Sequence, residues 1–269
     1  MNHHLSIAVY GAAGRMGRRV VAAVADDAET SLVAAIDHPD HPDGGTDAGT
    51  LAGVHPAGVN VGADWPTTAD AVIDFSLPGA VDGVLSAAAK RSIPLVIATT
   101  GFDELQRGHI ERASKDLPIV LAPSMSTAVN VAMKTAVDIM RSLSNVAGGV
   151  DVEIIERHHR FKADAPSGTA LRFGELVSGA MGGDVKEVHG RHGETGRRPR
   201  NEIGYHAVRV GDDFGRHTIV FGMMGERIEL DVAASSRDAY ATGSVAAAKW
   251  LAGKPAGLYT MFDVLGLND

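Results

Sequence analysis

The chain has 269 residues, of which 45% are hydrophobic and 22% charged, a composition that argues against disorder. Its net charge of −8 at pH 7 argues against a nucleic-acid binder with a basic surface. Because it contains no cysteine, disulfides, thiolate metal sites and cysteine nucleophiles are excluded. No segment approaches the ~20 consecutive apolar residues of a membrane span, and the first residues lack a secretory layout, so we expect a cytoplasmic protein without a membrane partner.

The N-terminal segment has the layout of a nucleotide-binding βαβ unit. A buried strand over 5–10 runs into a turn with the spacing GxxGxxG, and a helix and a second strand over 31–36 follow, closed by Asp37. Glycine lets the backbone approach a pyrophosphate, and the helix N-terminus favours its negative charge. The alternative interpretation is a glycine turn that serves only tight helix–strand packing.

Strands and helices alternate through the rest of the first half. Residues 38–70 read mostly as loop, and apolar strands are predicted over 71–75, 94–98 and 118–121 with helices over 78–90 and 103–115 between them. This alternation predicts an α/β domain with a Rossmann-like, doubly wound parallel sheet.

The pattern changes in the second half. Apolar residues recur at helical spacing over 128–143, and three strands are predicted near 203–210, 217–221 and 227–232, where short neighbouring strands favour antiparallel pairing. The charged, glycine-rich segment 182–201 is predicted to be a loop, and a last helix is predicted over 238–252. The second domain is therefore expected to be α+β.

One segment, EIIERHHRFKADAPSGTA over 153–170, concentrates candidate chemistry. It begins as a strand that we expect to end at Glu156, and His158, His159 and Lys162 follow. A helix start comes next, where Ser167–Thr169 offer backbone N–H groups to an anion. Histidine can give a proton near neutral pH, which makes His158 a candidate acid. The alternative is a polar loop with solvated histidines and an ordinary capped helix.

This segment resembles the signature of the dihydrodipicolinate reductase family, and the resemblance extends over essentially the whole chain. It implies reduction of 4-hydroxy-tetrahydrodipicolinate, a cyclic dicarboxylate, by a nicotinamide cofactor in the diaminopimelate route to lysine. It also implies a dinucleotide-binding domain of residues 1–126 plus 236–269 and a substrate-binding domain of residues 127–235. The resemblance implies a homotetramer, and the apolar surface of the second domain suggests that this domain carries the association.

The resemblance also assigns roles to residues. His158 and Lys162 are implied as proton donors and His159, Gly168 and Thr169 as substrate-binding residues, to which the helix-start argument adds Ser167. No metal site is expected. The residues implied to bind the cofactor are Gly11, Ala12, Ala13, Gly14, Arg15, Met16, Asp37, Ala98, Thr99, Thr100, Ala122, Pro123, Ser124 and Met125. The family pattern often carries a phenylalanine or asparagine in the last of these segments, where Met125 can still pack on the nicotinamide ring.

The residues around Asp37 favour NADH over NADPH. An aspartate at the end of the second strand accepts hydrogen bonds from ribose hydroxyls and repels a 2′-phosphate, and the next residue is His38 rather than an arginine. Arg15 in the glycine turn keeps NADPH open as an alternative.

Two other functions stay open from the sequence. One is another two-domain nicotinamide-dependent dehydrogenase, although a semialdehyde dehydrogenase would need the cysteine that this chain lacks. The other is a non-catalytic nucleotide-binding redox sensor. A sensor has no need of the HHxxK and PSGT segments, which argues against it.

Overall fold

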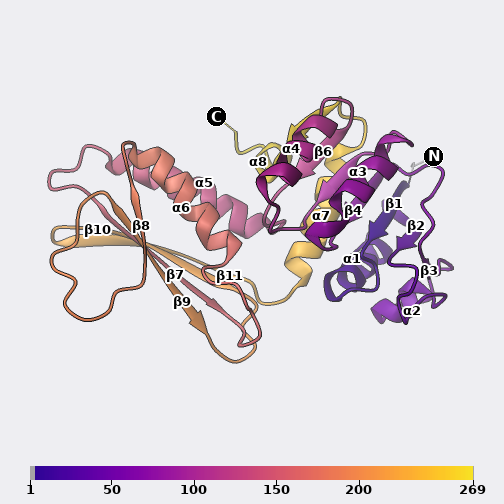
Figure 1. Ribbon diagram of the computed structural model, residues 1–269, viewed down its shortest axis with the longest axis horizontal. Coiled ribbons are helices and arrows are strands. Elements are labelled where there is room, and N and C mark those ends of the chain that lie inside the picture. Colours follow the sequence, from indigo (N-terminus) through magenta and orange to yellow (C-terminus); the bar gives the residue numbers. More distant parts are fainter. Residues whose placement is uncertain (1–3, 269) are drawn as a thin grey trace. The chain divides into compact units, whose positions relative to one another are not determined.

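Two separate sheets organise the chain (Figure 1). The structure is a computed structural model that describes residues 4–268. The first sheet lies in a unit formed by the chain up to Thr127 and from Arg237 onward, and the second lies in a unit of Ala128–Ser236. These limits fall within one residue of those expected from the sequence. No helix in the described part of the chain is long and apolar enough to cross a membrane.

The first unit contains a seven-stranded parallel sheet, which confirms the predicted doubly wound fold. Its spatial order is β12-β6-β5-β4-β1-β2-β3. The strands are β1 (Leu5–Tyr10), β2 (Thr30–Ile36), β3 (Val61–Gly62), β4 (Ala71–Asp74), β5 (Leu95–Ile97), β6 (Pro118–Leu121) and β12 (Gly257–Tyr259). The sequence analysis missed β12 because three residues are too short for a periodic pattern. The chain order reverses at β1, between β4 and β2, and ligands bind at the carboxyl ends of strands at such a point.

Helices cover both faces of this sheet. Buried residues of α1 (Arg15–Asp26) and α7 (Asp238–Leu251) share one core with β1 and β4, to which α8 (Met261–Leu265) and α2 (Ala48–Ala52) add side chains. Residues of α3 (Val81–Ala89) and α4 (Glu104–Ala113) form the second core with β1, β4, β5 and β6, and the short 3₁₀ helix η1 (Pro78–Ala80) precedes α3. A helix layer on each face is the arrangement that buries an all-parallel sheet.

The second unit contains a five-stranded mixed sheet, which confirms the predicted α+β architecture. Its order is β11-β10-β7-β9-β8. The strands are β7 (Asp151–His158), β8 (Lys186–His189), β9 (Glu202–Arg209), β10 (Arg216–Met223) and β11 (Glu226–Ala233). The prediction of antiparallel pairing holds for β10, which pairs with β7 and β11, but is wrong for β9, which runs parallel to β7 and β8. The chain reaches β8 and β9 from β7 through a helix, and such a crossover returns strands in parallel.

Two helices, α5 (Thr127–Leu143) and α6 (Gly168–Met181), lie on the same side of this sheet (Figure 1). The side chains of β7 alternate, with Val152, Ile154, Glu156 and His158 buried. Gly174 lets α6 approach β9 closely, because a Cβ there would lie 1.7 Å from the Tyr205 hydroxyl. The expected end of β7 at Glu156 is wrong by two residues, since pairing with both β9 and β10 continues to Arg157 and with β9 to His158.

Candidate active site

The last residue of β7, His158, begins a turn that is fixed by the connection between β9 and β10. The backbone N–H of His159 donates to the Asp213 carbonyl at 2.8 Å, and that of Arg160 donates to Gly211 at 3.0 Å. The turn closes through a bond from the Lys162 N–H to the His159 carbonyl at 3.1 Å. Backbone bonds therefore set the positions of the two histidines and the lysine, as strong obligatory groups should.

The imidazole of His158 is held by a buried carboxylate. Its Nδ1 lies 2.6 Å from Oε2 of Glu156, which is only 1% exposed. Arg209 donates to both oxygens of Glu156, each at 2.8 Å. Burial would raise the pKa of Glu156, but the bonds from His158 and Arg209 outweigh it and lower the pKa to about 2. Glu156 is therefore an anion throughout the neutral range.

A second histidine lies beside His158. The His217 ring meets that of His158 edge to face, with centroids 5.3 Å apart, and its Nε2 lies 3.0 Å from Oγ of Ser167. Burial, and then the charge of His158, lower the pKa of His217 to about 4. His217 is therefore neutral at pH 7 and forms an uncharged wall of the site.

Lys162 forms an ion pair within the same segment. Its Nζ lies 2.9 Å from Oδ2 of Asp164. Burial would raise the pKa of Asp164, but the bond to Lys162 outweighs it and lowers the pKa. The ammonium side chain remains 21% exposed, so it can also reach an anion from solvent.

The N-terminus of α6 follows, with Ser167 as its cap. Oγ of Ser167 accepts a bond from the N–H of Ala170 at 3.2 Å, and the N–H of Ser167 donates to Glu156 at 3.1 Å. Both groups thus have partners inside the protein. The N–H groups of Gly168 and Thr169 have no acceptor among the described residues, which leaves them for an anion.

The glycine turn in the first unit joins β1 to α1. Gly11 has a positive φ of 77°, and a Cβ on Gly17 would lie 1.9 Å from the Gly11 carbonyl oxygen, so the turn requires glycine for close packing. Gly14 caps α1 without a side-chain bond to its first N–H groups. Such an uncapped N-terminus beside exposed Gly14 and Arg15 fits a pyrophosphate.

Asp37 follows β2 and contacts this turn. Its Oδ2 accepts a bond from the Ala13 N–H at 2.8 Å, and its Oδ1 accepts one from the His38 N–H at 2.8 Å. The nearby arginines differ in their contacts. Arg18 pairs with Asp43 and Arg19 with Asp238, whereas Arg15 is exposed and makes no ion pair among residues 4–268.

The other predicted cofactor residues follow β5 and β6. Thr100 and Pro123 are exposed, whereas Ala98, Thr99, Ala122 and Ser124 are buried and can offer a ligand little beyond backbone. The Thr99 hydroxyl donates to the buried Asp74 at 3.2 Å, where burial raises the pKa of Asp74. Met125 is 1% exposed and packs in the core.

Sequence reasoning missed Glu156, Arg209 and His217. A signal existed for Glu156, because a charged residue there occupies a buried position of the strand alternation. The other two needed the strand register, which pairs His158 with Arg209 and Glu156 with His217. Among the residues that the structure describes, no group of three or more histidine, aspartate or glutamate side chains is arranged to hold a metal ion.

Comparisons with known proteins agree with this layout. The family model "Dihydrodipicolinate reductase, N-terminus" matches residues 5–125, and "Dihydrodipicolinate reductase, C-terminus" matches residues 128–265. The chain is 57% identical to the 4-hydroxy-tetrahydrodipicolinate reductase of Rhodopirellula baltica over 98% of this chain and 97% of the relative. It is 47% identical to the reductase of the same name from Alkalilimnicola ehrlichii, over 97% and 98%.

A solved structure also shares the fold. Dipicolinate-bound dihydrodipicolinate reductase from Paenisporosarcina sp. TG-14 superposes with a TM-score of 0.73 at 24% identity, over 95% of this chain and 97% of that one. Because both halves of the family model match and the sequence relatives are similar over nearly their whole length, this chain belongs to the dihydrodipicolinate reductase family.

Proposed function

We propose that this chain reduces 4-hydroxy-tetrahydrodipicolinate to tetrahydrodipicolinate with a nicotinamide cofactor, in lysine synthesis through diaminopimelate. The observation that carries the proposal is the turn after β7, where His158, His159 and Lys162 precede the open N-terminus of α6, in a chain of this family. A cytoplasmic location belongs to the same proposal.

The substrate is a dianion, so it needs fixed donors. The free N–H groups of Gly168 and Thr169 supply two of them, and the helix dipole adds positive potential at the same place. Lys162 and His159 flank the turn and supply charge and a ring N–H. Lys162 exchanges its bond to Asp164 for a substrate carboxylate, which its partial exposure allows.

In the proposed reaction the 4-hydroxyl leaves as water together with a ring hydrogen, hydride adds to the conjugated ring, and the resulting enamine takes up a proton. When bound, reduced nicotinamide supplies the hydride, and the residues of this chain supply everything else. His158 gives the proton from Nε2, because Nδ1 is occupied by Glu156. Lys162 is the second proton donor that membership of the family implies.

The glycine turn and the carboxyl ends of β5 and β6 are the cofactor-binding residues in this proposal. Gly14, Arg15 and the first N–H groups of α1 hold the pyrophosphate, and Thr100 and Pro123 lie exposed beyond the strand ends. Asp37 accepts hydrogen bonds from the ribose hydroxyls and favours NADH over NADPH. Arg15 is available to a 2′-phosphate and keeps NADPH use within the proposal.

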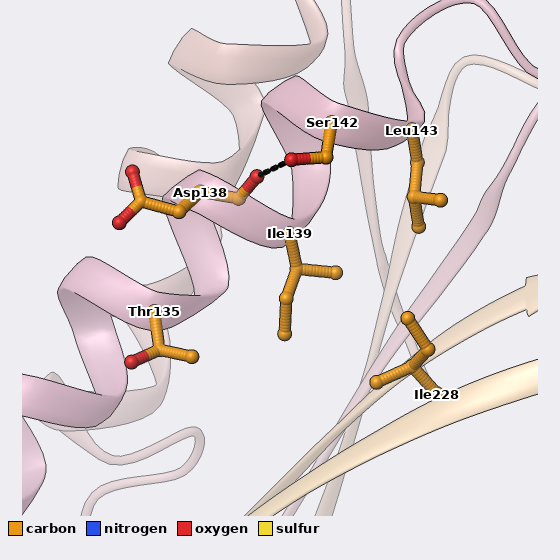
Figure 2. Close-up of a pocket in the computed structure, with 6 residues that line it drawn as sticks. All are labelled: Thr135, Asp138, Ile139, Ser142, Leu143 and Ile228. Carbon is orange, nitrogen blue, oxygen red and sulfur yellow. Dashed lines mark hydrogen bonds between the residues drawn. The ribbon is translucent and has the colours of Figure 1, made fainter.

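A homotetramer formed through the second unit is also part of the proposal. Figure 2 shows Ile139 and Leu143 of α5 facing Ile228 of β11. These residues line a groove of about 280 Å³, and β11 is an edge strand. Ile228 is 39% exposed and Val210 is 53% exposed. Exposed apolar side chains beside an open edge favour association with further copies. Light scattering at micromolar concentration should give four times the chain mass, and a monomer mass would contradict this.

The test of the reaction is an assay with freshly generated substrate and cofactor carrying deuterium at its hydride position. We expect loss of the cofactor's near-ultraviolet absorbance and transfer of the label to the product, detected by mass spectrometry. Tight cofactor binding without consumption would instead support the redox sensor. Consumption with an alternative substrate only would support another dehydrogenase.

A further inference from the structure

Glu156 is a buried carboxylate that the proposed reaction does not use directly. Charged side chains are almost never fully buried unless they are paired, so its place on the core-facing side of β7 needs a reason. Packing does not supply one, because an apolar residue would fit the alternation of Val152 and Ile154 better.

Both oxygens of Glu156 are fully occupied. Oε2 accepts bonds from Nδ1 of His158 at 2.6 Å and from Nη1 of Arg209 at 2.8 Å. Oε1 accepts bonds from Nη2 of Arg209 at 2.8 Å and from the N–H of Ser167 at 3.1 Å. A guanidinium stays charged at any working pH, and its bidentate bond fixes the carboxylate in position as well as in charge.

This arrangement decides which nitrogen of His158 carries hydrogen. An ionised carboxylate only accepts, so Nδ1 must be the donor in the 2.6 Å contact. Nε2 is then the nitrogen that gains and loses a proton. Among the described residues Nε2 has no hydrogen-bond partner, and it is not a fully buried atom, so it is open to a substrate.

We infer that Glu156 is a positioning residue for the reduction: by holding Nδ1–H of His158 it fixes the tautomer and aims Nε2 at the substrate, and Arg209 keeps Glu156 in place. This inference rests on the proposed function only for the identity of the reaction. The Glu156–His158 relationship itself can be measured without substrate.

The charge of Glu156 makes this carboxylate an acceptor only, and that keeps the hydrogen on Nδ1 of His158. Replacing Glu156 with glutamine removes that charge and offers an amide that can donate to Nδ1, which selects the wrong tautomer. Nδ1 then accepts instead of donating, and the ring is no longer fixed by an anion that Arg209 holds in place. The other ionisable groups near this cluster are Arg209, His217, Lys162, Asp164 and Asp213.

The experiment compares Glu156→Gln with Glu226→Gln, the same change at an exposed glutamate that begins β11. For Glu156→Gln we expect kcat to fall at least tenfold and the cofactor Kd to stay unchanged. Glu226→Gln should keep the wild-type kcat. Glu156→Asp, which retains the charge, should recover part of the lost kcat.

The second readout is the ¹⁵N NMR spectrum of His158 in the free protein. Wild type should show the Nδ1–H tautomer when neutral, and Glu156→Gln should show a mixture or the Nε2–H form. An unchanged tautomer in Glu156→Gln would overturn the inference, whether or not turnover is lost. If Glu156→Gln does not fold, Glu156→Asp decides by the same readouts. If the proposed substrate is not turned over at all, the proposed function fails while the NMR result still tests the positioning.

Discussion

The carboxylate of Asp37, at the end of β2, accepts a 2.8 Å hydrogen bond from the backbone N–H of Ala13 in the glycine turn. This bond ties the acid to the loop that we propose binds pyrophosphate. This bond orders the turn, and in our proposal the same side chain also places a negative charge beside the ribose of a bound dinucleotide.

The first prediction concerns cofactor choice. Wild type should use NADH at least as well as NADPH, and Asp37→Ser should shift the ratio of their kcat/KM values toward NADPH by about tenfold, or ~1.4 kcal/mol, because the repulsion of the 2′-phosphate is lost. Asp40→Ser is the control, since that side chain is 91% exposed and removes the same charge nearby. A tenfold preference of the wild type for NADPH would overturn this interpretation of Asp37.

The second prediction concerns the close approach of α6 to β9. A Cβ on Gly174 would lie 1.7 Å from the Tyr205 hydroxyl, so Gly174→Ala should lower the free energy of unfolding by about 1–3 kcal/mol. Gly179 lies in the same helix with open space around it, and Gly179→Ala should instead stabilise by roughly 0.5–1 kcal/mol. Denaturant unfolding of both variants checks the pair, and equal effects would contradict the packing described.

The third prediction concerns acid stability. Glu153 accepts bonds from Arg191, Arg198 and His206. Burial would raise its pKa, but these bonds outweigh it and lower the pKa from 4.5 to about 2. Since the folded value lies below the unfolded one, the contribution is complete above pH 4.5 and disappears as pH falls toward 2.

Glu153→Gln should therefore lower the free energy of unfolding by on the order of 3 kcal/mol at pH 7. Its free energy of unfolding should also depend less on pH below pH 4.5. It should also release the segment that carries Arg191 and Arg198, so limited proteolysis there should be faster. Glu226→Gln is the control, because Glu226 is exposed at the start of β11. A Glu153→Gln variant with an unchanged pH dependence of the thermal midpoint would show that the cluster contributes no stability.

Much of this fold was predictable from the sequence because its elements carry local patterns. The glycine turn and the apolar strands identified the first unit, and the alternation in β7 identified the second. The direction of β9 and the existence of β8 and β12 depended on partners distant in sequence, which no local pattern reports. The same is true of Arg209 and His217, which only the strand register brings beside Glu156 and His158.

The surroundings of two predicted site residues were also not readable from the sequence. Ser167 has the polarity of a ligand-binding residue, yet both its N–H and its hydroxyl are used within the unit. Met125 stands in a segment assigned to the cofactor, but its side chain fills the core. Residue type alone does not tell which neighbours compete for a polar group or which side of a loop faces inward.

The most direct test of the central claim is the turnover of His158→Ala and Lys162→Ala with the proposed substrate. We expect a loss of about 10²–10⁴-fold in kcat for each, because general acid catalysis is removed, while the cofactor Kd stays at the wild-type value. Lys186→Ala, an exposed lysine of β8, should retain full turnover. Near-full turnover in both the His158 and Lys162 variants would show that neither side chain is the proton donor.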